Sequence, residues 1–287
     1  MHMKKILYII GIVVVCLAAA WLIFAPKSKI AVSKDGVNIS YSVSGKGDPV
    51  LVFVHGWCGG RDVWFKQVPY FSKKYKVIAL DLAGHGASGK QRKDYTQEAF
   101  GEDVAAVVNA EGADKVILIG HSMAGTIILE ANRLIKDKVI GLIAIDTLAN
   151  FEYMPTPEDK AKYIEPMKKD FAKNSGPFVM TMFKKDADPW LVKEVDKNVS
   201  RFDPAIAVST LENYFDTPVI PLLTDVNVPL WCLNADLWPS YPEINSKYLK
   251  SYHLRIMPGQ DHFLMIESPD EFNRQLEDII NRIKKEA

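Results

Sequence analysis

Three residues that could act as a nucleophile, an acid and a base each follow a short apolar run. They are a serine, an aspartate and a histidine. Ser122 lies in residues 120–125, GHSMAG, between the apolar run 116–119 and a helical pattern at 126–135. A strand, a sharp turn and a helix would place Ser122 at the apex, and the small residues Gly120 and Ala124 let the two backbones approach each other. A serine hydroxyl needs a base to become a nucleophile, so the motif requires a histidine oriented by a carboxylate.

Both partners follow later strands in the chain. Asp236 comes just after the apolar run 230–233, and His262 comes after the run 254–257. Ligands of open α/β sheets bind beyond the carboxyl ends of the strands, so these positions predict a catalytic triad of Ser122, Asp236 and His262. Two other aspartates compete for the role of the acid: Asp146 follows the run 142–145, and Asp261 adjoins the histidine. The sequence favours Asp236 and keeps Asp146 as the alternative.

A nucleophilic serine also needs hydrogen-bond donors for the oxyanion that forms on the substrate. The apolar run 50–54 ends in residues 55–60, HGWCGG, a glycine-rich loop that can turn a backbone N–H toward the serine. We predict that the backbone N–H groups of Trp57 and Met123 form this oxyanion hole. Chemistry of this kind requires neither a metal nor an organic cofactor.

The elements that must position these residues alternate between strands and helices. Residues 30–33 and 37–41 predict an antiparallel hairpin, and continuous apolar runs at 50–54, 77–80, 116–119, 142–145, 230–233 and 254–257 predict strands of a buried sheet. Apolar residues at helical spacing in 97–110 predict one of the intervening helices. The predicted fold is therefore a mostly parallel, doubly wound α/β sheet.

The alternation fails at about residues 150–225, which are rich in Met, Phe and Lys and carry helical patterns. We interpret this segment as a helical cap inserted over the carboxyl edge of the sheet. Eight of its large apolar residues are candidates for a substrate pocket, although most are expected to attach the cap to the core: Phe151, Tyr153, Met154, Phe178, Met180, Met182, Phe183 and Trp190.

Together these motifs resemble those of the α/β-hydrolase superfamily, over nearly all of residues 30–287. Residues 55–57, 120–125, 234–236 and 261–263 correspond to the oxyanion loop, the nucleophile elbow, the acid turn and the histidine turn, and residues 81–88, DLAGHGAS, resemble the turn after the fourth strand. Ala124 departs from the usual glycine of the elbow. A serine at position 122 resembles the esterase, lipase and lactonase branch, whereas epoxide hydrolases and haloalkane dehalogenases carry aspartate there.

Several other residues of reactive types are most simply interpreted as structural. His85 and His121 lie in turns of the resembled family, and Asp81 is expected to fix its own glycine-rich turn. Cys58 is expected to be a small buried filler, since no base accompanies it. The spacing of the cysteines implies neither a disulfide framework nor a zinc site.

Composition argues against nucleic acid as a partner and indicates a membrane as one. The chain of 287 residues has 35 Lys and Arg against 35 Asp and Glu, so it lacks the basic excess of a nucleic-acid-binding protein. Residues 6–25 contain no charge and, as a helix, would span a bilayer. After the short basic segment 1–5, we predict a transmembrane signal anchor at 6–25, with the domain at 30–287 on the extracytoplasmic side; a cleaved signal peptide is the alternative.

The expected activity is hydrolysis of a carboxylic ester through an acyl-enzyme, with a small or medium hydrophobic acyl substrate. The same triad would also serve a lactonase, a carbon–carbon hydrolase or an acyltransferase. A ligand-binding receptor built on a hydrolase scaffold is the alternative from another functional class.

Overall fold

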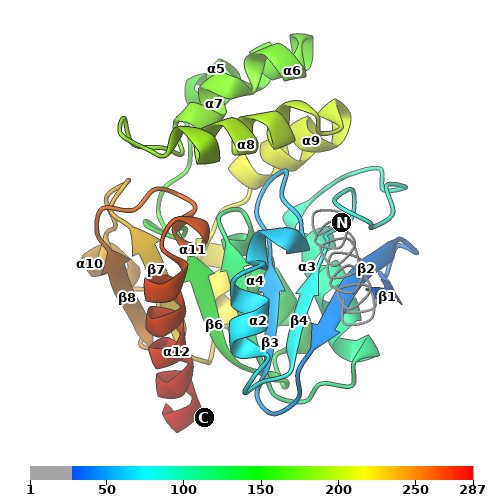
Figure 1. Cartoon of the computed structure of the whole chain (residues 1–287), viewed down its shortest axis with the longest axis vertical. Helices are drawn as coiled ribbons and strands as arrows, with labels where there is room; N and C mark the ends of the chain where they lie inside the picture. Colours follow the sequence, from blue (N-terminus) through cyan, green and yellow to red (C-terminus); the bar gives the residue numbers. More distant parts are fainter. Residues whose placement is uncertain (1–27, 287) are drawn as a thin grey trace, which may run out of the picture.

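The computed structural model describes residues 28–286, in which eight strands form one sheet (Figure 1). The strand order is β1-β2-β4-β3-β5-β6-β7-β8; β2 is antiparallel to both β1 and β4, and every other pair is parallel. The predicted α/β sheet is confirmed. The strands are β1 (Ser28–Val32), β2 (Asn38–Ser44), β3 (Val50–Val54), β4 (Val77–Leu80), β5 (Val116–His121), β6 (Val139–Ile145), β7 (Leu230–Ala235) and β8 (Tyr252–Met257).

Burial follows the position of each strand in the sheet. Every residue of β3, β5 and β7 is buried, because helices cover both faces of the central strands. Strand β8 lies at an edge and is mostly half-buried, which agrees with its interrupted apolar pattern. The predicted hairpin forms β1 and β2 at the opposite edge.

Helices pack against both faces of the sheet and make two separate apolar cores. One face is covered by α3 (Gln97–Ala110), α4 (Ala124–Ile135) and the 3₁₀ helix η2 (Ile220–Asp225). The other face is covered by η1 (Arg61–Trp64), α2 (Gln67–Phe71), α11 (Leu264–Glu267) and α12 (Pro269–Glu286). The short helix α10 (Pro242–Asn245) follows β7 and contacts β8.

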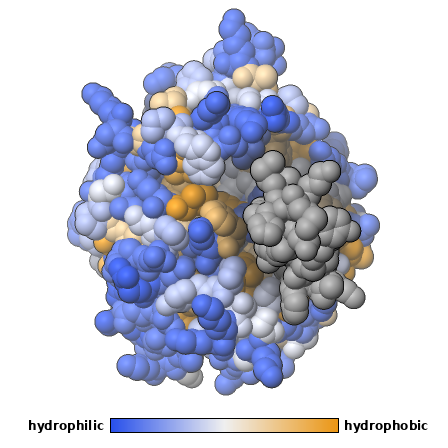
Figure 2. Space-filling model, viewed as in Figure 1, coloured by the Kyte–Doolittle hydropathy of each residue, from blue (hydrophilic) through white to orange (hydrophobic). Residues whose placement is uncertain are grey.

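A third group of helices forms a cap above the carboxyl ends of the strands (Figure 1). These are α5 (Pro157–Lys169), α6 (Phe171–Asn174), α7 (Gly176–Met180), α8 (Pro189–Ser200) and α9 (Pro204–Phe215), which share an apolar core of their own. The predicted insertion covers residues 150–225. Its last part, η2, does not join the cap but packs against α4 in the sheet domain. The face drawn in Figure 2 is mostly hydrophilic, with apolar surface at the level where the cap meets the sheet.

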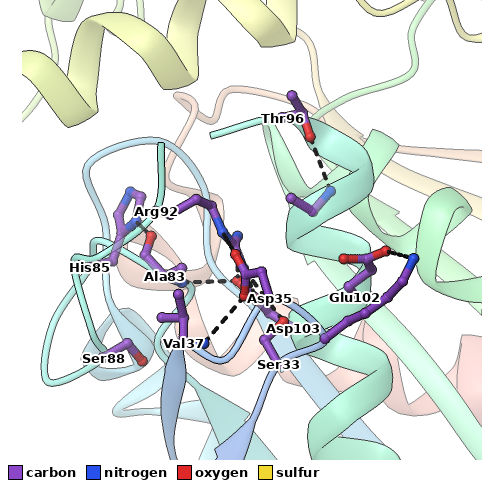
Figure 3. Close-up of polar contacts among 12 residues, drawn as sticks. Ser33, Asp35, Val37, Ala83, His85, Ser88, Arg92, Thr96, Glu102 and Asp103 are labelled. Carbon is purple, nitrogen blue, oxygen red and sulfur yellow. Dashed lines mark hydrogen bonds and ion pairs between the residues drawn. The ribbon is translucent and has the colours of Figure 1, made fainter. Parts of the chain in front are cut away.

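A buried ion pair fixes the hairpin edge of the sheet to the helix layer (Figure 3). The Arg92 guanidinium lies 2.6 Å from Asp103 on α3 and 2.7 Å from Asp35 in the turn between β1 and β2. The second Asp103 oxygen accepts a hydrogen bond from the Ala83 N–H at 3.0 Å. Arg92 therefore joins three segments that are far apart in sequence, including the loop that follows β4.

The fold prediction requires one correction. The predicted transmembrane helix at residues 6–25 lies outside the described residues, and between residues 28 and 286 no helix has the length and apolar character needed to cross a membrane. The described architecture is an α/β sheet with a helical cap. The anchored architecture and the membrane localisation based on it are therefore not retained.

Candidate functional site

Ser122 occupies a strained turn between β5 and α4. Its φ is +56°, in the left-handed region that non-glycine residues rarely adopt, and α4 begins two residues later. The turn is tight: a Cβ on Gly120 would lie 2.4 Å from the Ala124 carbonyl oxygen. The predicted elbow is therefore present, and it places Ser122 at the carboxyl edge of the sheet, where its side chain lines a cavity.

His262 lies in the turn after β8 and is almost completely buried. Its Nδ1–H donates a hydrogen bond to Asp146 Oδ2 at 2.6 Å, and Nε2 is the ring nitrogen left for the serine side. Its backbone is held at both ends: the N–H donates to the Met182 carbonyl oxygen at 3.1 Å, and the carbonyl accepts from His121 Nε2 at 2.9 Å. Ser122, Asp146 and His262 line the same cavity.

Asp146 follows β6 directly and has a φ of +47°. Its carboxylate is buried and uses both oxygens, because Oδ1 accepts a hydrogen bond from the Ala235 N–H at 2.8 Å while Oδ2 faces His262. The next residue, Thr147, donates its N–H to the Asn234 side chain at 3.2 Å. The end of β7 thus supports the turn that carries Asp146.

Asp236 is not brought to His262, and the predicted triad is corrected on this point. Its Oδ1 accepts hydrogen bonds from Lys184 Nζ at 2.6 Å and from the Gly259 N–H at 2.9 Å, at an exposed position. The hydrogen bond from Lys184 holds the pKa of Asp236 below its usual value. Asn234 and Ala235, at the end of β7, support the Asp146 turn, whereas Asp236 does not line the cavity.

The glycine-rich loop at residues 55–60 and the elbow approach each other closely. A Cβ on Gly56 would lie 3.0 Å from Ser122 Cβ, so a larger residue at this position would press against the serine. Among the described residues, neither the Trp57 N–H nor the Met123 N–H donates a hydrogen bond, which leaves both donors free. The Trp57 ring is fixed to the cap, because its Nε1–H donates to the Ala207 carbonyl oxygen at 2.8 Å.

The nearby histidines and Cys58 have the structural character expected from the sequence. Burial lowers the pKa of His55 and of His121, which favours the neutral ring in each case. His55 Nδ1–H donates to the Gly56 carbonyl oxygen at 2.8 Å, while Nε2 accepts from the Leu82 N–H at 3.1 Å. Burial raises the pKa of the Cys58 thiol, which disfavours the reactive thiolate.

Asp81 fixes its own turn, as predicted. Its two carboxylate oxygens accept hydrogen bonds from the Arg61 N–H at 2.8 Å and the Ala87 N–H at 3.0 Å. A Cβ on Gly86 would lie 2.3 Å from this carboxylate, so the turn needs glycine there. His85 lies in the same turn, with Nδ1 3.0 Å from the Ala83 carbonyl oxygen (Figure 3).

A cavity of about 540 Å³ lies between the carboxyl edge of the sheet and the cap. Its walls combine Ser122, Asp146 and His262 with aromatic, hydroxyl and amide side chains. Most of these other side chains come from the cap and from the segments after β6 and β7. The residues of the wall are Ser122, Thr126, Asp146, Thr147, Leu148, Ala149, Asn150, Tyr153, Met154, Pro155, Asp159, Tyr163, Phe178, Thr181, Met182, Tyr214, Phe215, Thr217, Val219, Asn234, Trp238, Pro239, Ser240, Tyr241 and His262.

The apolar cap candidates divide into three groups. Four line the cavity: Tyr153, Met154, Phe178 and Met182. Phe151 and Phe183 are buried in apolar packing, whereas Met180 and Trp190 are exposed. The sequence pattern did not reveal the other cavity aromatics, which are Tyr163 on α5, Tyr214 and Phe215 on α9, and Trp238 and Tyr241 in the loop after β7. A surface helix carries aromatic residues at the same spacing as a cavity wall, and the loop has no periodic pattern.

The chain is similar in sequence to known proteins. A family model described as the alpha/beta hydrolase fold matches residues 49–188. The karrikin insensitive 2 receptor CA of Petunia hybrida is 24% identical over 243 residues, covering 79% of this chain and 90% of the receptor. The bifunctional esterase/perhydrolase of Acinetobacter calcoaceticus is 39% identical over 95 residues, which cover 32% of this chain and 34% of that enzyme.

Solved structures resemble the whole domain. A thermophilic esterase from Thermogutta terrifontis superimposes with a TM-score of 0.76 at 20% identity, covering 90% of this chain and 99% of the esterase. At this identity the likeness concerns the fold, and it agrees with the family match and with the strand order. The chain belongs to the α/β-hydrolase superfamily.

Proposed function

We propose that this protein is a serine hydrolase that cleaves a carboxylic ester through an acyl-enzyme. The observation that carries the proposal is the 2.6 Å hydrogen bond between His262 Nδ1 and the buried Asp146, beside a serine held at a left-handed elbow. In this proposal Ser122 is the nucleophile, His262 the base and Asp146 the acid. The Trp57 and Met123 N–H groups are the oxyanion donors.

Acylation begins when His262 Nε2 takes the Ser122 hydroxyl proton and Ser122 Oγ attacks the ester carbonyl. The carbonyl oxygen becomes an oxyanion bound by the two backbone N–H groups, and Asp146 stabilises the imidazolium. When the tetrahedral intermediate collapses, the C–O bond to the alcohol breaks and His262 returns the proton to the leaving oxygen. In deacylation His262 takes a proton from water, and the water oxygen attacks the acyl carbon. The bond from that carbon to Ser122 Oγ then breaks, His262 returns the proton to Ser122, and the carboxylic acid leaves.

The cavity supports a substrate of small or medium size. A volume of about 540 Å³ lies within the range of pockets for small organic ligands. Aromatic side chains supply much of its wall, which favours an ester with a hydrophobic acyl or alcohol group.

Similarity to a plant receptor supports a second candidate function. A receptor on this scaffold would bind its ligand in the same cavity and would hydrolyse it slowly or not at all. A lactonase, a carbon–carbon hydrolase or an acyltransferase would use the same groups as the esterase, so substrate profiling separates these activities.

The test is turnover of nitrophenyl esters of increasing acyl length by the full chain, compared with Ser122→Ala. We expect ester turnover by the natural chain, a covalent fluorophosphonate adduct on Ser122, and loss of both in the variant. Equal turnover by the two proteins contradicts the serine mechanism. Absence of turnover and of the adduct, with a raised melting temperature on adding a lactone or ester ligand, favours the receptor.

A further inference from the structure

Aromatic rings form a continuous strip along the cap side of the cavity. The centroids of Tyr163 and Phe178 are 5.2 Å apart, those of Phe178 and Phe215 are 6.1 Å apart, and those of Phe215 and Tyr214 are 5.9 Å apart. Trp238 supplies a ring on the opposite side, 5.2 Å from the His262 ring. A flat aromatic group bound next to Ser122 would therefore find ring faces and edges within stacking distance.

The charges on the cavity wall all have the same sign. Asp146 and Asp159 line the cavity, and among the described residues that line it none is a lysine or an arginine. Asp146 is buried, and its carboxylate accepts the hydrogen bond from His262. The acidic side chains of the wall are therefore Asp146, beside His262, and Asp159, at an exposed position.

Three cap lysines that are close in sequence to cavity residues make contacts of their own. Lys160 is paired with Asp216, and Lys184 is paired with Asp236. Lys162 is exposed and lies over the Tyr163 ring, 5.2 Å from its centroid, without lining the cavity. An anionic ligand would have to break one of these contacts to gain a cationic partner.

We propose that this cavity selects esters of uncharged or cationic aromatic alcohols and rejects esters that carry a carboxylate. This inference rests on the proposed esterase function and adds the substrate class. A carboxylate entering the cavity would lose hydration, would meet Asp146 and Asp159, and would find no cation in return. Aromatic faces attract a cation as well as a neutral ring, so the other two classes are accepted.

Three aryl acetates that differ only in the para substituent test the selectivity: phenyl acetate, 4-acetoxybenzoate and 4-(trimethylammonio)phenyl acetate. Each kcat/KM for the full chain is divided by the rate of hydrolysis by hydroxide, which removes the difference in leaving-group reactivity. The carboxylate ester is expected to be at least about 10-fold poorer than phenyl acetate, and the cationic ester at least as good. Equal corrected values for the carboxylate and phenyl esters overturn the proposal.

A matched pair of threonines tests whether the missing cation is the cause. Thr217 lines the cavity, whereas Thr224 is an exposed residue of η2 that does not. Thr217→Lys is expected to raise the corrected kcat/KM for the carboxylate ester relative to phenyl acetate by about 10-fold, and Thr224→Lys to leave the ratio unchanged. The same ratio change in both variants shows a general surface effect and contradicts the proposal.

The results that would contradict this selectivity differ from those that would contradict the proposed function. If Ser122→Ala abolishes turnover of all three acetates but the natural chain does not discriminate among them, the serine esterase stands and the selectivity is wrong. If Ser122→Ala hydrolyses phenyl acetate like the natural chain, the proposed function itself is wrong.

Discussion

At the scale of single residues, two aspartates that follow neighbouring parallel strands lie in different environments. Asp146 ends β6 and has both oxygens enclosed by His262 and the Ala235 N–H. Asp236 ends β7 and faces Lys184 and Gly259 at the surface. In the proposed mechanism only the enclosed carboxylate stabilises the imidazolium, because a charge interaction is stronger where water is excluded.

The two isosteric substitutions Asp146→Asn and Asp236→Asn separate these roles. Asp146→Asn removes the carboxylate that fixes the tautomer of His262, so kcat is expected to fall by about 10³- to 10⁴-fold. Asp236→Asn is expected to lower kcat by less than about 10-fold, since it removes only a partly exposed ion pair. Steady-state kinetics with a nitrophenyl ester measure both effects, and thermal unfolding checks that each variant is folded. The reverse order of the two losses would return the acid role to Asp236.

The choice between the two aspartates also shows where sequence reasoning reaches its limit. Local patterns predicted Ser122 and His262 as the nucleophile and the base that we propose, since an elbow and a turn after a strand are encoded by neighbouring residues. Both aspartates follow apolar strands, so the local pattern is the same for each. Contacts distant in sequence make the difference: Lys184 comes from the cap, and the Ala235 N–H comes from the adjacent strand.

At the scale of elements, one cap segment is built into the histidine turn. Between α7 and α8, the Met182 carbonyl oxygen accepts the His262 N–H, and the Lys184 N–H donates to Asp261 Oδ1 at 2.8 Å. The Phe183 ring stacks on Phe263 with centroids 5.6 Å apart. This part of the cap therefore helps to hold the backbone of His262, and the sequence pattern of the cap alone did not indicate it.

The ion pair between Lys184 and Asp236 is expected to stabilise this contact. In Lys184→Met, the His262 amide should exchange its hydrogen about 2- to 5-fold faster, because a partly exposed ion pair contributes at most about 1 kcal/mol. Hydrogen exchange followed by mass spectrometry on a peptide containing residues 258–264 measures the change. Lys185→Met, at the exposed neighbouring position, is the control and should exchange like the natural chain. Identical exchange in all three proteins would mean that the pair does not support the turn.

At the scale of the whole molecule, stability depends on how the hairpin edge is attached to the helix layer. Arg92 and Asp103 are buried, and burial raises the pKa of Asp103 by more than hydrogen bonds from Arg92 lower it. Lys34 and Glu102 form a second ion pair between the same hairpin and α3, but the Lys34 side chain is 77% exposed. The two pairs join the same elements in different environments, which makes them a matched comparison.

Arg92→Met is expected to lower the free energy of unfolding by roughly 3 to 5 kcal/mol at pH 7.5, because it leaves the Asp103 carboxylate buried without its cation. Lys34→Met should lower this free energy much less, because the Lys34 side chain is 77% exposed and water screens its interaction with Glu102. Without Arg92 the folded-state pKa of Asp103 rises further above its unfolded value, so the folded state binds a proton first and the deficit of Arg92→Met should shrink as the pH falls to 5. Urea unfolding of both variants at the two pH values measures this. A deficit in Arg92→Met that is constant with pH would mean that its loss acts through packing rather than through the charge on Asp103.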